Sequence, residues 1–180
     1  MSIPKVIHYC WFGGNPLPKS AEKCIKSWQK HCPDYEIKRW DETNFDVNCN
    51  AYCKFCYENK KWAFLTDYTR LKVIYDNGGV YLDTDVEVLR PFDSLLNDTS
   101  FIGLEESLAL LPGTCVMGCE AHCQWVKDMI ATYDNAIFVR EDGTLDMTTN
   151  VQRLGAKMVE GGLQHERKIQ YHPQGGLRVY

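Results

Sequence analysis

The chain has 180 residues, of which 44% are hydrophobic and 24% charged, an ordinary globular composition that can bury a sizeable core in one domain. The formal net charge of −4 gives no reason to expect a nucleic acid or an anionic membrane as partner. Residues 1–5 lead into a short apolar run that lacks the features of a signal peptide, and no apolar stretch has the length of a bilayer span. We therefore expect a soluble protein, which could still associate peripherally with a membrane.

The cysteine content predicts the redox setting. Nine cysteines are an odd number, unlike the paired set of a small secreted disulfide scaffold. Several of them, such as Cys24, occupy positions where any small apolar residue would pack. We expect the protein to be in the reducing cytoplasm, a location that includes the inner face of a membrane.

Strand and helix patterns alternate along the chain. The predicted strands cover residues 5–12, 35–40, 80–89, 100–104, 115–118 and 168–172. The predicted helices cover residues 20–31, 51–77 with a break near Trp62, 122–133 and 150–159. Pro33 ends the first helix, and Gly78 with Gly79 ends the second helical stretch. This alternation predicts an α/β fold with a mostly parallel central sheet flanked by helices, in one domain over residues 1–180.

The sharpest chemical feature follows the double glycine, where residues 80–85 read VYLDTD. If residues 80–89 are one strand, Asp83, Asp85 and Glu87 share a face with Tyr81. Two carboxylates two residues apart repel each other unless a positive charge lies nearby, and the sequence shows no obvious internal cation for them. Mg²⁺ and Mn²⁺ prefer oxygen ligands and often share them with substrate phosphates. The pattern favours a divalent metal site, although two solvated carboxylates on an exposed strand would give the same letters.

The helix before this strand carries a second polar pair. Residues 64, 68, 71 and 75 form an apolar stripe at helical spacing, and Asp67 and Arg70, three residues apart, lie on its flank. We expect both side chains to border the core. An ordinary surface ion pair is one interpretation. The other is that Asp67 accepts hydrogen bonds from sugar hydroxyls, while Arg70 offsets developing phosphate charge.

Three ordered blocks together resemble the DXD-motif sugar transferases of glycosyltransferase family 32, and also the catalytic domains of the clostridial glucosylating toxins. The blocks are residues 3–14 (IPKVIHYCWFGG), residues 67–70 (DYTR) and residues 78–85 (GGVYLDTD). The sequence CPDYE at residues 32–36, followed by Trp40, fits the same group. The resemblance is dense from residue 3 to about residue 105 and weaker beyond it.

The resemblance implies a GT-A fold, a nucleotide-sugar donor, Mn²⁺ or Mg²⁺ as cofactor, and retention of anomeric configuration. It places Trp11 against the donor base, with the backbone near Tyr9 contacting it, and gives Asp83 the ribose and sugar hydroxyls. Asp85 would bind the metal directly, with Asp83 beside it, so that Asp83, Asp85 and Arg70 form the catalytic set. A UDP-sugar is the favoured donor. A glycan or lipid-linked glycan, as in capsule or surface-polysaccharide synthesis, is the expected acceptor.

The resemblance also predicts a further C-terminal segment, bearing a His and a Ser-Trp pair near the metal, which the 180 residues do not include. A non-catalytic module that binds nucleotide sugars without turning them over is an alternative.

A rival from another enzyme class rests on cysteines. Cys49, Cys53 and Cys56 fit the C-x3-C-x2-C spacing of radical-SAM enzymes, whose three thiolates bind an iron–sulfur cluster. The same spacing places all three on one helical face, where they can simply pack, and we prefer that interpretation. Cys115, Cys119 and Cys123 are four residues apart, but without a fourth ligand nearby they do not indicate a zinc site.

Overall fold

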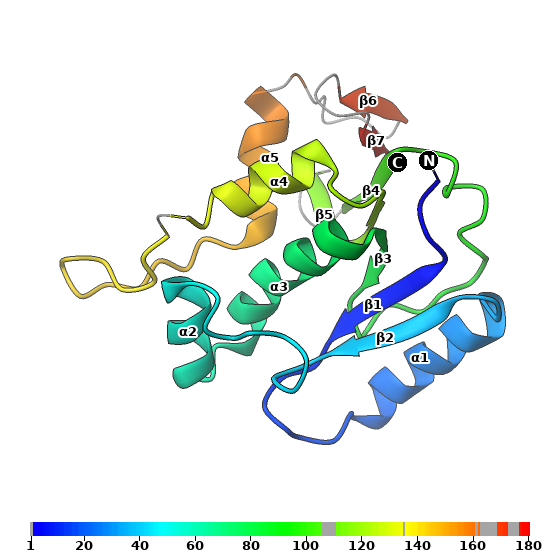
Figure 1. The fold of residues 1–180 in the computed structure, drawn as a ribbon. Helices are drawn as coiled ribbons and strands as arrows, with labels where there is room; N and C mark the ends of the chain where they lie inside the picture. The colour runs from blue at the N-terminus through cyan, green and yellow to red at the C-terminus, as the bar shows by residue number, and fades with distance from the viewer. Residues whose placement is uncertain (1, 106–110, 135, 161, 163–168, 173–176) are drawn as a thin grey trace.

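A computed structural model describes residues 2–105, 111–134, 136–160, 162, 169–172 and 177–180. Its described strands form one twisted sheet in the order β2-β1-β3-β5-β4-β7-β6, with helices on both faces (Figure 1). The strands are β1 Val6–Cys10, β2 Glu36–Trp40, β3 Gly79–Leu82, β4 Ser100–Glu105, β5 Leu111–Cys119, β6 Gln170–His172 and β7 Leu177–Val179. The helices are α1 Lys19–His31, α2 Ala51–Glu58, α3 Trp62–Asn77, α4 Gln124–Ala131 and α5 Asn150–Glu160.

The α/β class and the element order agree with the sequence analysis, including the break before Trp62 and the glycine stop after α3. Gly78 ends α3 with φ of 66°, a conformation that favours glycine. The sheet is mixed, however, and not mostly parallel. Strand β1 runs parallel to β2 and β3, and β4 runs parallel to β7, while β5 is antiparallel to both β3 and β4. The short connection between β4 and β5 explains the difference, because parallel neighbours need a long crossover.

Two expected boundaries shift for local reasons. Strand β5 begins at Leu111 instead of residue 115, and its first part contains Pro112 and Gly113, which weaken a strand prediction. Helix α4 begins at Gln124 instead of residue 122, because His122 has φ of 62° and therefore belongs to the preceding turn.

The largest difference concerns the acidic segment. Residues 80–89 were expected to form one strand, but β3 ends at Leu82, and the chain then turns through Asp83, whose carbonyl accepts a hydrogen bond from the Val86 amide at 3.1 Å. The expectation that Asp83, Asp85 and Glu87 share one strand face is therefore wrong. A polar Asp-Thr-Asp run can bond its own backbone in a turn, and that option competes with the strand ladder.

The sheet separates two apolar cores. One is built with α2, α3, α4 and α5 and includes Tyr81 from β3. The other lies against α1 and includes Val80 and Leu82, the alternate residues of the same strand. Within the described residues, none of the helices combines the length and the apolar character needed to cross a membrane.

Candidate active site

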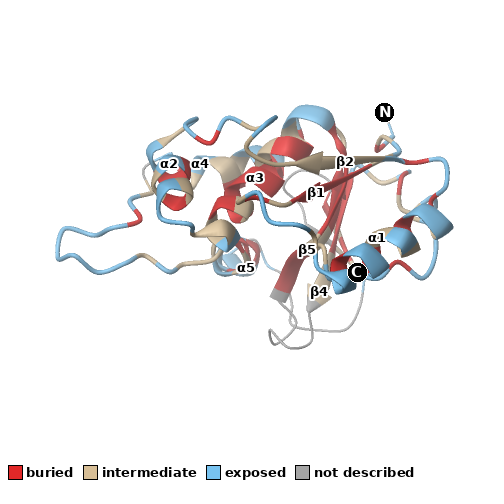
Figure 2. Cartoon of the chain, turned by 90° about the horizontal axis from the view of Figure 1, so that it is seen from below, coloured by how far each residue is buried: buried red, intermediate tan, exposed pale blue. Residues whose placement is uncertain are grey.

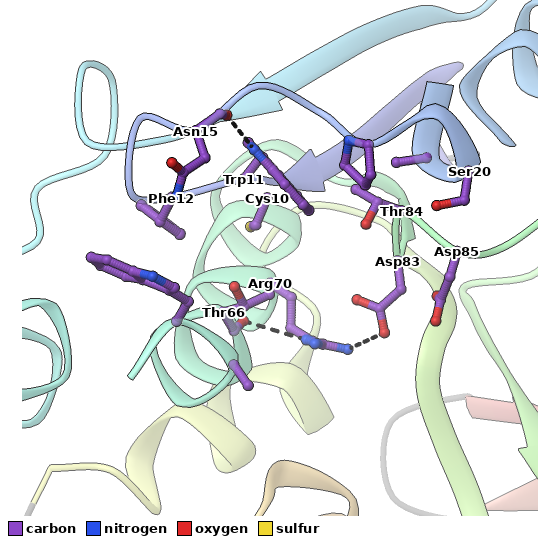
Figure 3. Close-up of a pocket in the computed structure, with 14 residues that line it drawn as sticks. Cys10, Trp11, Phe12, Asn15, Ser20, Thr66, Arg70, Asp83, Thr84 and Asp85 are labelled. Carbon is purple, nitrogen blue, oxygen red and sulfur yellow. Dashed lines mark hydrogen bonds and ion pairs between the residues drawn. The ribbon is translucent and has the colours of Figure 1, made fainter. Parts of the chain in front are cut away.

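A cleft of about 620 Å³ opens beside the end of β3 (Figure 3). Its walls come from the end of β1 and the loop after it, the start of α1, the first turns of α3 and the turn after β3. Of the residues that the sequence singled out, four line it: Trp11, Arg70, Asp83 and Asp85. Ligands commonly bind beyond the carboxyl ends of strands in open α/β sheets, and β1 and β3 both end here.

Asp83 is fixed by its neighbours. Its backbone amide donates to the Cys115 carbonyl at 2.9 Å, which extends the β3–β5 ladder by one bond. Its Oδ2 accepts from Arg70 Nη1 at 3.1 Å (Figure 3). Its Oδ1 accepts from the Tyr81 hydroxyl at 2.9 Å. The carboxylate is thus oriented before any ligand arrives. The sequence argument that no internal cation serves the acidic pair is wrong for Asp83, since Arg70 provides one.

Arg70 is the centre of a buried polar cluster. Its side chain is 8% exposed and lies over the Tyr81 ring, 4.9 Å from the centroid. The Nη1 atom also donates to the Thr114 carbonyl at 3.0 Å and contacts the Thr114 hydroxyl at 3.2 Å. Burial acts to lower the pKa of Arg70, but Tyr81, Asp83 and Asp67 outweigh it and raise that pKa. The guanidinium is therefore permanently charged and held in place.

Asp67 lies behind Arg70 and is not among the residues that line the cleft. Its Oδ1 is 3.6 Å from Arg70 Nη2, and its Oδ2 accepts from the Asn150 amide at 3.0 Å. Asn150 Oδ1 in turn accepts from the Thr114 hydroxyl at 2.9 Å. Burial raises the pKa of Asp67, while Arg70 and the Asn150 amide oppose that rise. A core-bordering position was expected for Asp67 and is confirmed, whereas its contact with a sugar stays a prediction.

The environment of Asp85 differs from that of Asp83. It is exposed and makes no side-chain hydrogen bond or ion pair with any residue that the structure describes. It faces the same cleft as Asp83 (Figure 3). Within the described part of the chain, no three His, Cys, Asp or Glu side chains converge on one point. Two carboxylates with substrate phosphate oxygens are a usual ligand set for Mg²⁺ or Mn²⁺. The residues therefore fit a divalent ion that a phosphorylated ligand helps to hold.

The aromatic residues divide between cleft and core. Trp11 directly follows β1, half-buried, and its Nε1 donates to the Asn15 carbonyl at 2.8 Å, which fixes the ring (Figure 3). Tyr9 does not line the cleft: it is 8% exposed and packs edge-on against Trp28 of α1. Sequence reasoning missed Trp62, which lines the cleft from the start of α3 and contacts Tyr57 edge-on.

The three cysteines of the rival interpretation do not form a three-ligand group in the described structure. Cys53 and Cys56 are fully buried in the core beside α3, whereas Cys49 precedes α2 and is exposed. We expect the purified protein to be colourless and to stay so after anaerobic reconstitution with iron and sulfide. Cys49 interacts with Cys53, but among the described residues no three Cys, His, Asp or Glu side chains are grouped so that they could hold a metal. A visible absorption spectrum measures this, and a stoichiometric brown cluster would contradict it.

Comparison with known proteins identifies the acidic region. Residues 18–102 match a family model described as a glycosyltransferase sugar-binding region containing a DXD motif. This stretch contains Arg70, Asp83 and Asp85. Residues 18–102 are therefore similar to the sugar-binding region of the DXD-motif glycosyltransferases.

Curated relatives agree with this family. Inositol phosphoceramide mannosyltransferase 3 of Schizosaccharomyces pombe is 31% identical over 105 residues, covering 56% of this chain and 29% of that protein. Subversion of eukaryotic traffic protein A of Legionella pneumophila is 23% identical over 133 residues, covering 54% of this chain and 20% of that protein. The chain thus spans less than a third of the length of these two relatives.

Solved glycosyltransferases share the fold. The PaToxG glycosyltransferase superposes with a TM-score of 0.61 at 17% identity, over 72% of this chain and 60% of that one. The galactosyltransferase LgtC, solved with donor and acceptor sugar analogues, gives a TM-score of 0.53 at 13% identity, over 97% of this chain and 72% of that one. The chain has the GT-A fold that was expected.

Proposed function

We propose that this protein is a glycosyltransferase that uses a divalent metal and a nucleotide-sugar donor, with a UDP-sugar favoured, and that it transfers the sugar to a glycan or lipid-linked glycan with retention of configuration. The observation that carries the proposal is the contrast between the two aspartates. Asp83 is held by Arg70 and Tyr81, while Asp85 faces the cleft without a described partner. Asp83, held in place as a hydrogen-bond acceptor, suits a sugar hydroxyl. The carboxylate of Asp85 suits a metal ion that also binds the diphosphate.

Each cleft residue then has a task. Trp11 presents a fixed indole for stacking on the donor base, and Trp62 lines the same cleft from α3. Asp83 accepts hydrogen bonds from donor hydroxyls in an orientation set by Arg70. Asp85, with Asp83 beside it, would hold Mn²⁺ or Mg²⁺, which when bound neutralises the diphosphate leaving group. Arg70 supplies fixed positive charge near that group, and because it is already oriented, its contribution costs no reorganisation during reaction.

The first test is cooperative stabilisation. Because Asp85 needs phosphate oxygens to complete a metal site, Mn²⁺ and a UDP-sugar together should raise the melting temperature by more than the sum of their separate shifts. Thermal melts with each ligand alone and with both measure this. GDP-mannose is the matched comparison, since the relative from Schizosaccharomyces pombe is named as a mannosyltransferase. Shifts that are equal with and without metal would contradict the proposal.

Turnover is tested separately from binding. Release of nucleotide from the same donors, measured with and without Mn²⁺, distinguishes a transferase from a module that only binds nucleotide sugars. Cooperative stabilisation without release would favour the binding module. A role in capsule or surface-polysaccharide synthesis, and a cytoplasmic location at the inner face of a membrane, are part of the proposal and rest on the sequence arguments.

A further inference from the structure

Helix α1 carries a row of lysines on its outer face. Its four lysines, Lys19, Lys23, Lys26 and Lys30, are spaced by four, three and four residues. At about 100° per residue they fall within an arc of roughly 60°, and they extend over about 16 Å of helix. The buried side chains of α1, Ala21, Cys24 and Trp28, face the opposite direction. The four lysines therefore point directly away from the sheet.

This face is open to solvent in the described structure. All four lysines are exposed, and α1 covers the edge of the molecule beside β1 and β2 with its outer side free (Figures 1 and 2). The one described ion pair in the row joins Lys23 to Glu87 at 3.5 Å, with both side chains largely solvated. Such a pair contributes little. Glu22 lies about 40° to the side of the row.

The row is local, because the whole chain carries a net charge of −4. A general attraction to anions is therefore not expected, and binding would depend on how the protein is oriented. Beside the helix, the segment after the Asp-Thr-Asp turn is fixed by two hydrogen bonds, from Trp28 Nε1 to the Val86 carbonyl and from the Val88 amide to Ser27. This segment continues to Leu89, which is 73% exposed. Leu89 lies two residues beyond Glu87, which pairs with Lys23 of the row. An exposed apolar side chain in the segment that contacts the row suits a lipid surface better than a soluble polyanion.

We propose that the outer face of α1 docks this protein on a membrane surface rich in anionic phospholipid. Each lysine close to such a surface adds about fivefold to the partition coefficient. The first residues of α1, including Ser20 and Ala21, line the donor cleft, so docking through the outer face of α1 holds the cleft close to the membrane, on the other side of this helix. That consequence rests on the proposed transfer to a lipid-linked acceptor. The docking itself does not depend on it.

The test is vesicle binding by flotation, with neutral phosphatidylcholine vesicles compared with vesicles containing about one third phosphatidylserine. We expect binding only to the anionic vesicles, and weaker binding at high salt. Replacement of the four lysines of α1 by glutamine should reduce binding to the level of neutral vesicles. The matched control replaces four exposed lysines elsewhere, Lys54, Lys60, Lys127 and Lys157, by glutamine, which changes the net charge equally.

The control should retain more affinity than the α1 variant by at least about tenfold. Equal losses in the two variants, or no binding of the wild-type chain to anionic vesicles, would overturn the proposal. Binding to a soluble anionic polysaccharide but not to vesicles would overturn it too and assign the row to a glycan. Thermal melts and donor release in the absence of lipid should match in all three proteins, so that failure of the donor chemistry is seen separately from failure of docking.

Discussion

Asp85→Asn should abolish metal-dependent donor binding while leaving the apo fold intact. The substitution keeps the size of the side chain and removes the charge that we assign to the metal. Because Asp85 is exposed and has no described partner, apo stability should hold or rise slightly as repulsion with Asp83 is relieved. Donor hydrolysis should fall by about 100-fold or more, since a metal contributes several kcal/mol to transition-state charge stabilisation. Thermal melts and nucleotide release, with and without Mn²⁺, measure both effects.

Glu87→Gln is the matched control, two residues further along. It makes the same carboxylate-to-amide change, but Glu87 is solvated and, among the residues that the structure describes, pairs only with Lys23. Its loss should alter the free energy of unfolding by less than about 0.5 kcal/mol and leave donor binding unchanged. An Asp85→Asn protein that is destabilised, yet binds metal and nucleotide normally, would contradict the assignment of Asp85 as a metal ligand.

Arg70→Met should have the largest effect on the fold. The change leaves Asp67 buried and Asp83 half-buried without their cation. Removing one partner of a buried ion pair costs about 3–5 kcal/mol. For a chain of this length the melting temperature should therefore fall by about 10 °C. Lys72→Gln is the control, because Lys72 lies two residues after Arg70 on α3 and forms a solvent-exposed ion pair with Asp76. Its loss should cost less than about 1 kcal/mol.

The loss of unfolding free energy caused by Arg70→Met should depend on pH. Burial raises the pKa of Asp67 already, with Arg70 as the opposing influence, so removal of Arg70 raises that pKa further. A carboxyl whose pKa is higher in the folded than in the unfolded state takes up protons on folding. Stability then falls as pH rises from the ordinary value of 3.8 through the raised one. The variant should thus lose less stability at pH 5 than at pH 8. A penalty that is independent of pH would show that Asp67 is not the uncompensated group.

The sequence predicted what local patterns determine. Periodicity placed Asp67 and Arg70 on the core side of α3, and the double glycine located the end of that helix. It failed at the acidic segment, because the apolar alternation continues through Val86 and Val88 although the backbone has already turned at Asp83. A turn within an Asp-Thr-Asp run and a continuing strand give similar letters, and only the tertiary contacts decide between them.

The contacts that organise the site are non-local. Asp83 binds Arg70, which lies 13 residues earlier in the chain. Arg70 also donates to Thr114, at a separation of 44 residues. Asn150 lies 83 residues from Asp67. No spacing rule links these positions, so the sequence supplied the members of the cluster around the DXD motif but not its connections. Trp62 was noticed only as a helix break, since a Trp at the start of a helix carries no sign of what it faces.

The Asn150–Asp67 hydrogen bond limits how this chain can be divided. The matched family region ends at residue 102, yet two of the groups that restrain Arg70 and Asp67, Thr114 on β5 and the first amide of α5, lie beyond it. A fragment cut at the family boundary would keep the complete motif and lose its scaffold. The carboxylate of Asp67 and the guanidinium of Arg70, which are buried in the native fold, would then be exposed to water. Shorter expression fragments of this protein should therefore extend through α5, even when the chemistry of interest is confined to the first half of the chain.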